Sequence, residues 1–299
     1  MLGLQDGGEL MTGQQHHRVS GAFRLAAAVL AAMAGASAAN AGSPAASYPY
    51  SASMFFGAGG VWTSDSNGDY DIASIVAGGD FVLPLRERFN LQLGGALRSD
   101  SYHYSFYDFS YNLTSVQGSA IAFWRDPDSG VLGAEAGLFA ENQFSGKFVK
   151  LGGVAEIYPS QQWTIGAFGG GLVPIVPAEN KFSWYAGGHT THYLSDDFAI
   201  SAQVAFQDIK FYFGDYQSLR VGGELRYLTP LDGLELAAAG YYHRCQHDDP
   251  TIGSFVADGA EALLSLRIHL GGTPGSLMTR DRSGTLDTRT WTCDAFSFL

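Results

Sequence analysis

The sequence predicts an all-β protein, an antiparallel transmembrane β-barrel of about twelve strands, and three observations support this prediction. Alternating apolar and polar or small residues recur from residue 52 to residue 270, often around a Gly-Gly pair, as in Phe56–Val61 and Leu91–Leu97. Alternation with a period of two gives a strand one apolar face and one polar face. The segments have the length of about ten residues that a tilted strand needs to cross a bilayer. No segment after residue 41 approaches about eighteen continuous apolar residues, and a membrane protein without such a helix has to close its backbone hydrogen bonds in a barrel.

The first element is a short, alanine-rich apolar stretch that follows Arg24 and ends in small residues. This pattern is typical of a secretory signal peptide that is cleaved after Ala38 or Ala41. The stretch is too short for a spanning helix. Because Asp6 is out of place ahead of such a stretch, Met11 is a candidate start of the chain as well as Met1.

The twelve strands are expected in the part of the chain that follows. They lie at residues 52–63, 72–83, 88–98, 113–124, 131–141, 147–158, 162–172, 182–193, 198–210, 218–228, 233–243 and 259–270.

The connections between these strands alternate in character. Five are short and have turn compositions, at residues 84–87, 125–130, 159–161, 194–197 and 229–233. The others are longer or more polar and aromatic, at residues 64–71, 100–112, 142–146, 174–181, 211–217 and 244–255. This alternation predicts short periplasmic turns, longer extracellular loops, and periplasmic N- and C-termini.

Aromatic residues beside the short turns support this orientation. They are Trp124, Tyr158, Trp163, Tyr193, Phe198 and Tyr227. An interfacial girdle of a membrane barrel has aromatic residues in such places. The alternative interpretation is that aromatic residues favour strand ends in any sheet.

The net charge of −12 limits the function. An acidic chain is a poor partner for nucleic acid, and an acidic lumen modestly favours cations. The alternative class is a soluble, secreted β-sandwich or barrel, which would bury the apolar face of each strand. The alternation alone does not separate this class from a membrane barrel.

The strand pattern, the signal peptide and the alternating connections resemble the outer-membrane β-barrel proteins of Gram-negative bacteria, a group that includes small porins and autotransporter barrel domains. The resemblance covers about residues 52–270. It implies a location in the outer membrane, contact with its lipids and lipopolysaccharide, and assembly by the barrel assembly machinery. Such proteins commonly end on a strand with a terminal aromatic residue, whereas a tail follows the last strand here.

The domain organisation follows from these observations. We expect a signal peptide at residues 1–41, a periplasmic N-terminal segment at 42–51, the barrel at 52–270, and an irregular periplasmic tail at 271–299.

Charged residues on the inward faces form the candidate functional site, a lumen charge network. Its members are Asp80, Arg98, Glu135, Lys150, Glu156, Arg220, Glu224, Arg226, Glu235, Glu261 and Arg267. One interpretation is a charged constriction that selects solutes. The other is a salt-bridged network that fills and stiffens the lumen.

Three functions remain open at this point. The first is a small porin-like channel for small polar solutes, or a structural barrel of the envelope. The second is a barrel of a secretion or envelope-biosynthesis system that binds periplasmic partners through the tail. The third is a lipid-modifying enzyme, which the neighbouring His103 and Ser105 suggest. No residue that orients His103 is identifiable, so no catalytic site is expected.

Two segments have the residue types of metal sites. Residues 65–71 offer oxygen atoms at alternate positions, but glycine and glutamate are missing from the positions that a calcium loop requires. The other segment contains His243, Cys245, His247, Asp248 and Asp249, with a spacing that matches no structural zinc pattern. We therefore expect no metal and no cofactor.

The two cysteines, Cys245 and Cys293, are expected on opposite sides of the membrane. This placement predicts two free thiols, because a disulfide would require the tail to pass through the lumen.

Overall fold

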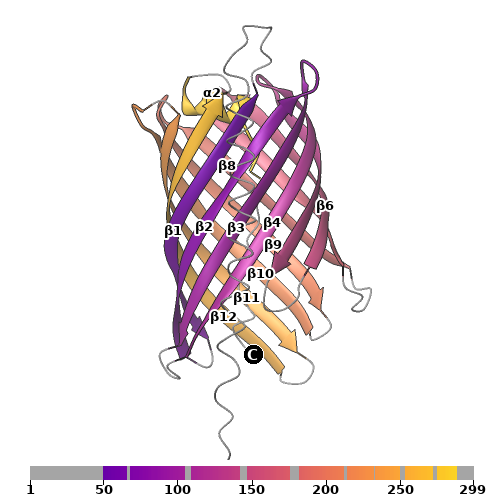
Figure 1. The fold of residues 1–299 in the computed structure, drawn as a ribbon, viewed down its shortest axis with the longest axis vertical. Coiled ribbons are helices and arrows are strands. Elements are labelled where there is room, and N and C mark those ends of the chain that lie inside the picture. The colour runs from indigo at the N-terminus through magenta and orange to yellow at the C-terminus, as the bar shows by residue number, and fades with distance from the viewer. Residues whose placement is uncertain are drawn as a thin grey trace, which may run out of the picture. The chain divides into compact units, whose positions relative to one another are not determined.

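A computed structural model of the chain describes residues 50–65, 68–104, 109–141, 147–175, 182–211, 214–231, 233–249, 253–271 and 275–287. Within these ranges twelve strands form a closed antiparallel barrel, in which consecutive strands pair and β12 returns to β1 (Figure 1). The strands are β1 (Ser51–Asp65), β2 (Gly68–Pro84), β3 (Phe89–Tyr104), β4 (Phe109–Asp126), β5 (Gly130–Glu141), β6 (Lys147–Ser160), β7 (Trp163–Pro174), β8 (Ser183–Tyr193), β9 (Phe198–Phe211), β10 (Gly214–Leu228), β11 (Leu234–Asp249) and β12 (Gly253–Gly271), and the helix α2 (Leu277–Ser283) follows them. The predicted fold class and strand number are confirmed.

Several strands extend beyond their predicted ends, and they do so at the end of the barrel where longer loops were expected. β3 ends at Tyr104 rather than at residue 98, and β12 begins at Gly253 rather than at residue 259. The hydroxyl of Ser101 donates to the side-chain oxygen of Asn112 at 2.7 Å across the β3–β4 pair. These strand extensions have the polar and aromatic composition that is typical of loops. They are strands nevertheless, because an antiparallel ladder continues as long as the two backbones stay in register.

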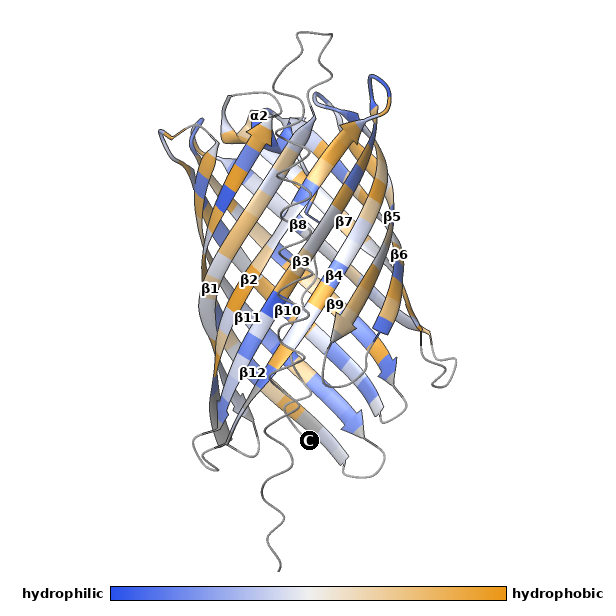
Figure 2. Ribbon diagram, in the orientation of Figure 1, coloured by the Kyte–Doolittle hydropathy of each residue, from blue (hydrophilic) through white to orange (hydrophobic). Residues whose placement is uncertain are grey.

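The two faces of the wall have opposite chemistry. Large apolar side chains on the outer face are exposed, such as Ile75 at 63% and Leu264 at 70%. Buried charges such as Glu235 and Glu261 lie on the inner face. Bands of hydrophobic and hydrophilic residues alternate along the strands (Figure 2). An apolar outer surface of this kind suits lipid contact, whereas the soluble alternative would bury the apolar face.

The predicted aromatic girdle is wrong for two of its residues. Trp163 and Tyr227 lie on the outer face and are exposed, as a girdle requires. Tyr158 and Tyr193 are buried on the inner face instead. Side chains two residues apart on a strand point to the same face. Both tyrosines are in step with the inward residues of their strands, so strand alternation places them in the lumen.

Inward glycines make room for side chains of adjacent strands. A Cβ atom on Gly166 would lie 2.2 Å from the Cε1 atom of His189, and a Cβ atom on Gly222 would lie 2.5 Å from the Tyr241 ring. The His189 and Tyr241 rings therefore lie directly against the backbone of the barrel wall.

The tail is not irregular throughout, because it contains the helix α2 at one end of the barrel (Figure 1). The side chain of Ser276 caps the helix by accepting a hydrogen bond from the backbone amide of Thr279 at 3.3 Å. Leu277 is fully buried and packs with Tyr193 and Leu228. Its backbone amide donates to the carbonyl of Asp196 at 2.7 Å, which places α2 beside the short β8–β9 turn.

Other predictions concern residues that the structure does not describe. The signal peptide, nearly all of segment 42–51 and the end of the tail from residue 288 lie outside the described ranges. The domain boundaries stay predictions. No helix in the described part of the chain is long and apolar enough to cross a membrane.

We expect Gly222→Ala to lower the free energy of unfolding by about 1–3 kcal/mol, the usual effect of overpacking. The new methyl group would meet the Gly240 carbonyl oxygen and the Tyr241 ring. The matched control is Gly240→Ala, because the nearest atom to its methyl group would be 3.9 Å away. Urea unfolding of the folded barrel in detergent, followed by tryptophan fluorescence, measures both. Equal unfolding midpoints would contradict this packing.

Candidate functional site

The lumen contains a first group of buried ionic residues, the Glu261 cluster. It consists of Arg98, Asp100, Arg220, His243 and Glu261. The two oxygens of Glu261 lie 3.0 Å from Nη1 of Arg98 and 2.9 Å from Nη2 of Arg220. His243 Nε2 is 2.8 Å from Glu261, and Arg98 also contacts Asp100 at 2.9 Å. Two guanidinium groups and two carboxylates thus balance one another in a buried site that joins β3 to β10, β11 and β12.

A second group, the Glu235 cluster, consists of Glu224, Arg226, Glu235, Arg267 and His269. Arg226 binds Glu235 through two hydrogen bonds, from Nε at 2.8 Å and from Nη2 at 2.9 Å. His269 Nε2 lies 2.9 Å from Glu235, and Arg267 approaches it to 3.5 Å. Glu224 has a longer contact of 3.6 Å with Arg226. Since Glu235 is 0% exposed, its charge depends entirely on these partners.

The remaining predicted residues stand apart from the two clusters. Glu135 pairs with Lys150 at 3.0 Å. Glu156 lies 3.5 Å from His189. Asp80 accepts a hydrogen bond from Gln92 at 3.3 Å. The predicted network is therefore divided into groups, and its functional role stays a prediction.

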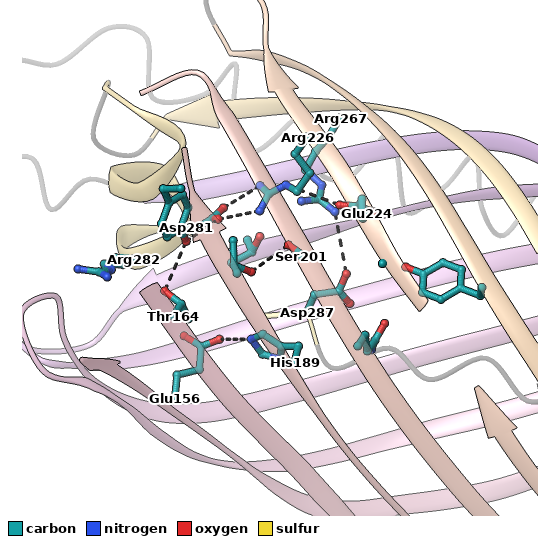
Figure 3. A pocket seen from close by; sticks show the side chains of 16 residues that line it. Glu156, Thr164, His189, Ser201, Glu224, Arg226, Arg267, Asp281, Arg282 and Asp287 are labelled. Atoms are coloured by element: carbon teal, nitrogen blue, oxygen red, sulfur yellow. Dashed lines mark hydrogen bonds and ion pairs between the residues drawn. The ribbon is translucent and has the colours of Figure 1, made fainter. Parts of the chain in front are cut away.

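The tail enters this charge system through Asp281 of α2. Arg226 donates to both carboxylate oxygens of Asp281, at 2.7 and 2.8 Å (Figure 3). The hydroxyl of Tyr193 donates to the same carboxylate at 2.9 Å. Arg226 thus links a wall carboxylate, Glu235, to a tail carboxylate.

Hydrogen bonds of Arg282 and Gly284 hold the tail against the lumen wall. Arg282 donates to the carbonyls of Ser160 and Trp163 at 2.6 and 2.9 Å, and its guanidinium lies 4.4 Å from the centre of the Tyr158 ring. Arg125 on β4 donates to the carbonyl of Gly284.

Leu286 is fixed on the other side of the barrel. The side-chain amide of Gln92 on β3 donates to its carbonyl and accepts from its backbone amide, both at 2.7 Å. Its side chain is buried in a cluster with Ile121 and Phe123. Because β3 and β10 lie on opposite sides of the barrel order, residues 276–287 cross the lumen. We call residues 276–287 the plug segment.

A polar cavity of about 140 Å³ remains between the plug segment and the wall (Figure 3). The wall contributes Glu156, His189 and Glu224, and the plug segment contributes Asp281 and Asp287. Three guanidinium groups, from Arg226, Arg267 and Arg282, several hydroxyl side chains, one amide side chain and Gly223 complete the lining. A polar space of this volume is large enough for several water molecules.

Sequence reasoning missed several residues of this site. Asp100 was assigned to a loop, although continued alternation from Arg98 would have placed it in the lumen. Gln92 and Arg125 carry no signal in the sequence that identifies them as tail contacts, and neither does Asp281.

The prediction of two free thiols is wrong. Cys245 is buried on the inner face and is disulfide-bonded. The sequence contains one other cysteine, Cys293, which lies outside the described residues. The expectation assumed that the tail leaves the barrel, whereas its residues 276–287 run inside the barrel.

The hypotheses of metal binding and catalysis gain no support from the geometry. A disulfide-bonded Cys245 is not a thiolate ligand, and the described ranges contain no group of three or more His, Cys, Asp or Glu residues that could hold a metal ion. His103 Nδ1 lies 3.2 Å from the hydroxyl of Ser110, while Ser105 lies outside the described residues.

Comparisons with known proteins agree with the fold. No protein-family model matches the chain, and no curated protein matches it either. The structure is similar to an outer membrane channel from Pseudomonas putida F1, with a TM-score of 0.52 and 11% identity over 77% of this chain and 98% of that chain. This likeness shows that the chain has an outer-membrane β-barrel fold.

Weaker likenesses connect the chain to two other barrels. One is the translocator domain of the autotransporter NalP from Neisseria meningitidis, with a TM-score of 0.43, 10% identity, and 81% and 96% coverage of the two chains. The other is the Pseudomonas putida toluene transporter TodX, with a TM-score of 0.43, 9% identity, and 75% and 90% coverage.

We expect Glu261→Gln to lower the free energy of unfolding by about 3–5 kcal/mol, because two buried guanidinium groups lose their shared carboxylate. Asp258→Asn is the control on the same strand, since its carboxylate is exposed. Urea unfolding measures both. A Glu261→Gln barrel as stable as the control would refute the charge pairing in the Glu261 cluster.

We expect Asp281→Asn to loosen the plug segment. Losing a charge-assisted pair costs about 1.5–3 kcal/mol, so trypsin should cut at Arg280 at least about tenfold faster. Asp128→Asn in the exposed β4–β5 turn is the control. Mass spectrometry of timed digests gives the rates, and equal rates would show that Asp281 does not hold the plug segment.

Proposed function

We propose that the protein is an outer-membrane channel for small polar solutes, with a lumen narrowed at the periplasmic end by its own plug segment. The observation that carries this proposal is the polar cavity between the plug segment and the wall. It is a polar space that is large enough for water. It lies inside a barrel of twelve strands, a size between packed eight-stranded barrels and open sixteen-stranded ones. The fold that the chain shares with an outer membrane channel supports the same function.

The exposed apolar outer face supports the location. Side chains such as Leu132 and Leu138 would contact the outer-membrane lipids, and lipopolysaccharide would surround the outer half of the barrel. The short turns, the first residues of β1 and the tail lie at the end of the barrel that contains α2. In the proposed orientation this is the periplasmic end. The barrel assembly machinery would insert such a chain.

The charges around the cavity favour cations modestly. Four carboxylates line it, from Glu156, Glu224, Asp281 and Asp287. Three guanidinium groups oppose them, from Arg226, Arg267 and Arg282. The excess of negative charge has the same sign as the net charge of −12 and attracts cations.

The burial of the plug segment argues against the alternative of a secretion or biosynthesis barrel that binds partners through its tail. Leu277, Arg282 and Leu286 are buried in the lumen. A periplasmic partner that bound these three residues would have to displace the plug segment from the lumen. A transport role accounts for the polar lumen more directly than an enzymatic role, because no catalytic arrangement accompanies it among the described residues.

Conductance of single molecules in planar bilayers tests the channel. We expect small openings for the full chain and several-fold larger openings after deletion of residues 276–299, because the plug segment no longer narrows the lumen. Heat-modifiable gel mobility checks that the shortened barrel is folded, and Asp281→Asn serves as a second variant if it is not. The absence of openings in every folded variant would refute the channel and leave a structural barrel.

Ion selectivity gives a further expected outcome. Reversal potentials in a potassium chloride gradient should show a modest preference for potassium, and Glu224→Gln should reduce it because one lining carboxylate is lost. Asp258→Asn, outside the lumen, is the control. An anion-selective wild-type channel would contradict the proposed role of the lining carboxylates.

A further inference from the structure

We propose that the cavity between the plug segment and the wall is a binding site for a small zwitterion, a solute such as a short α-amino acid that carries one carboxylate and one ammonium group. Glu224 of β10 binds the ammonium group, and Arg267 of β12 binds the carboxylate. Passage of the solute rests on the proposed channel function, whereas its binding does not.

Glu224 is a lining carboxylate that makes no hydrogen bond to any described residue. Its ion pair with Arg226 is long, at 3.6 Å between Oε1 and Nε. The Nε atom of an arginine carries a single hydrogen, and Arg226 donates it to Glu235 at 2.8 Å. The carboxylate of Glu224 therefore keeps its capacity to accept hydrogen bonds from a solute.

Arg267 is a lining guanidinium that the fold holds loosely. Its Nη1 atom lies 3.5 Å from Glu235, and its Nη2 atom lies 4.0 Å from Asp287. Charge-assisted hydrogen bonds are shorter, at about 2.7–2.9 Å. Glu235 is bound more closely by Arg226 and His269, at 2.8 and 2.9 Å. Arg267 makes no hydrogen bond to a described residue, so its planar fork of donors remains open to a carboxylate.

The two groups belong to one site. β10 and β12 both pair with β11, and Glu224, Arg267 and Tyr241 of β11 line the same cavity (Figure 3). A charged group that leaves bulk water without gaining a hydrogen bond is costly, so such a group needs a partner. One acceptor and one donor of opposite charge in a shared cavity match a solute that carries both charges.

A solute with a single charge satisfies only half of this site. A carboxylate alone would bind Arg267 and leave Glu224 without a donor, and an amine alone would do the reverse. Sites of this kind discriminate strongly, because the wrong solute leaves a polar group of the protein unpaired. A zwitterion also has no net charge, so the negative excess of the lining carboxylates does not repel it.

The volume and lining of the cavity indicate a short side chain. The volume of about 140 Å³ corresponds to about four or five water molecules of about 30 Å³ each. Apart from the rings of Tyr193 and Tyr241, the lining side chains are polar. A large apolar side chain would gain little burial there, so glycine, alanine and serine fit the site better than leucine.

Binding is tested by titration calorimetry of the folded, full-length protein in detergent. The probes are alanine, propionate, which lacks the ammonium group, and ethylamine, which lacks the carboxylate. We expect alanine to bind at least about tenfold more tightly than either analogue, because each analogue forfeits one charge-assisted contact. Failure of alanine to bind, or equal binding of one analogue, would overturn the proposal.

Variants assign the two groups. Glu224→Gln and Arg267→Gln should each weaken alanine binding at least about tenfold. Arg267→Lys keeps the positive charge beside Glu235 but loses the planar fork, so it should also bind alanine more weakly, and it serves if Arg267→Gln does not fold. The matched controls are Asp258→Asn and Arg244→Gln, an exposed pair on the neighbouring strands β12 and β11. Unchanged binding in folded Glu224 and Arg267 variants would overturn the assignment.

Bilayer recordings separate the site from the channel. We expect alanine to reduce the current through wild-type openings and to have a much smaller effect on those of Glu224→Gln. Calorimetric binding without any current would support the site and refute the channel. Current that alanine does not alter, together with no calorimetric binding, would support the channel and refute the site.

Discussion

Closure of the hydrogen-bonded ladder between β1 and β12 is the constraint on which the rest of the structure depends. β1 pairs with β12 along its whole length, from Ser51 opposite Gly271 to Asp65 opposite Ala257. Closure removes the sheet edges, whose unpaired backbone groups would be costly in lipid. It also divides the side chains of every strand into an outer and an inner set. The apolar residues lie outside, so the charged residues between them have to lie inside.

Burial of so many charges requires that they pair with one another. The Glu261 cluster achieves this with wall residues, since two arginines share Glu261 and Asp100 completes the balance. The Glu235 cluster combines wall residues with the tail, because Arg226 contacts both Glu235 and Asp281. The plug segment is therefore part of the charge balance of the lumen and not a separate appendage.

The plug segment also determines what space the lumen offers. It crosses the barrel near the short turns and leaves a polar cavity against the strands from β6 to β12. In the proposed channel, passage of a solute would depend on how firmly the plug segment is held.

The sequence by itself determined the number of strands, their faces and most of the inward charges, because a period of two is a local property that closure leaves unchanged. It misassigned Tyr158 and Tyr193 because their position beside a turn favoured a girdle, whereas strand alternation points them into the lumen. It misassigned Asp100 because composition alone does not locate the end of a strand. Only the tertiary structure decided which charges pair, as between Arg98 and Glu261, 163 positions apart. It also decided that the tail turns into the lumen and that Cys245 is bonded. These contacts depend on strand order, tilt and closure, which bring together residues with no local pattern in common.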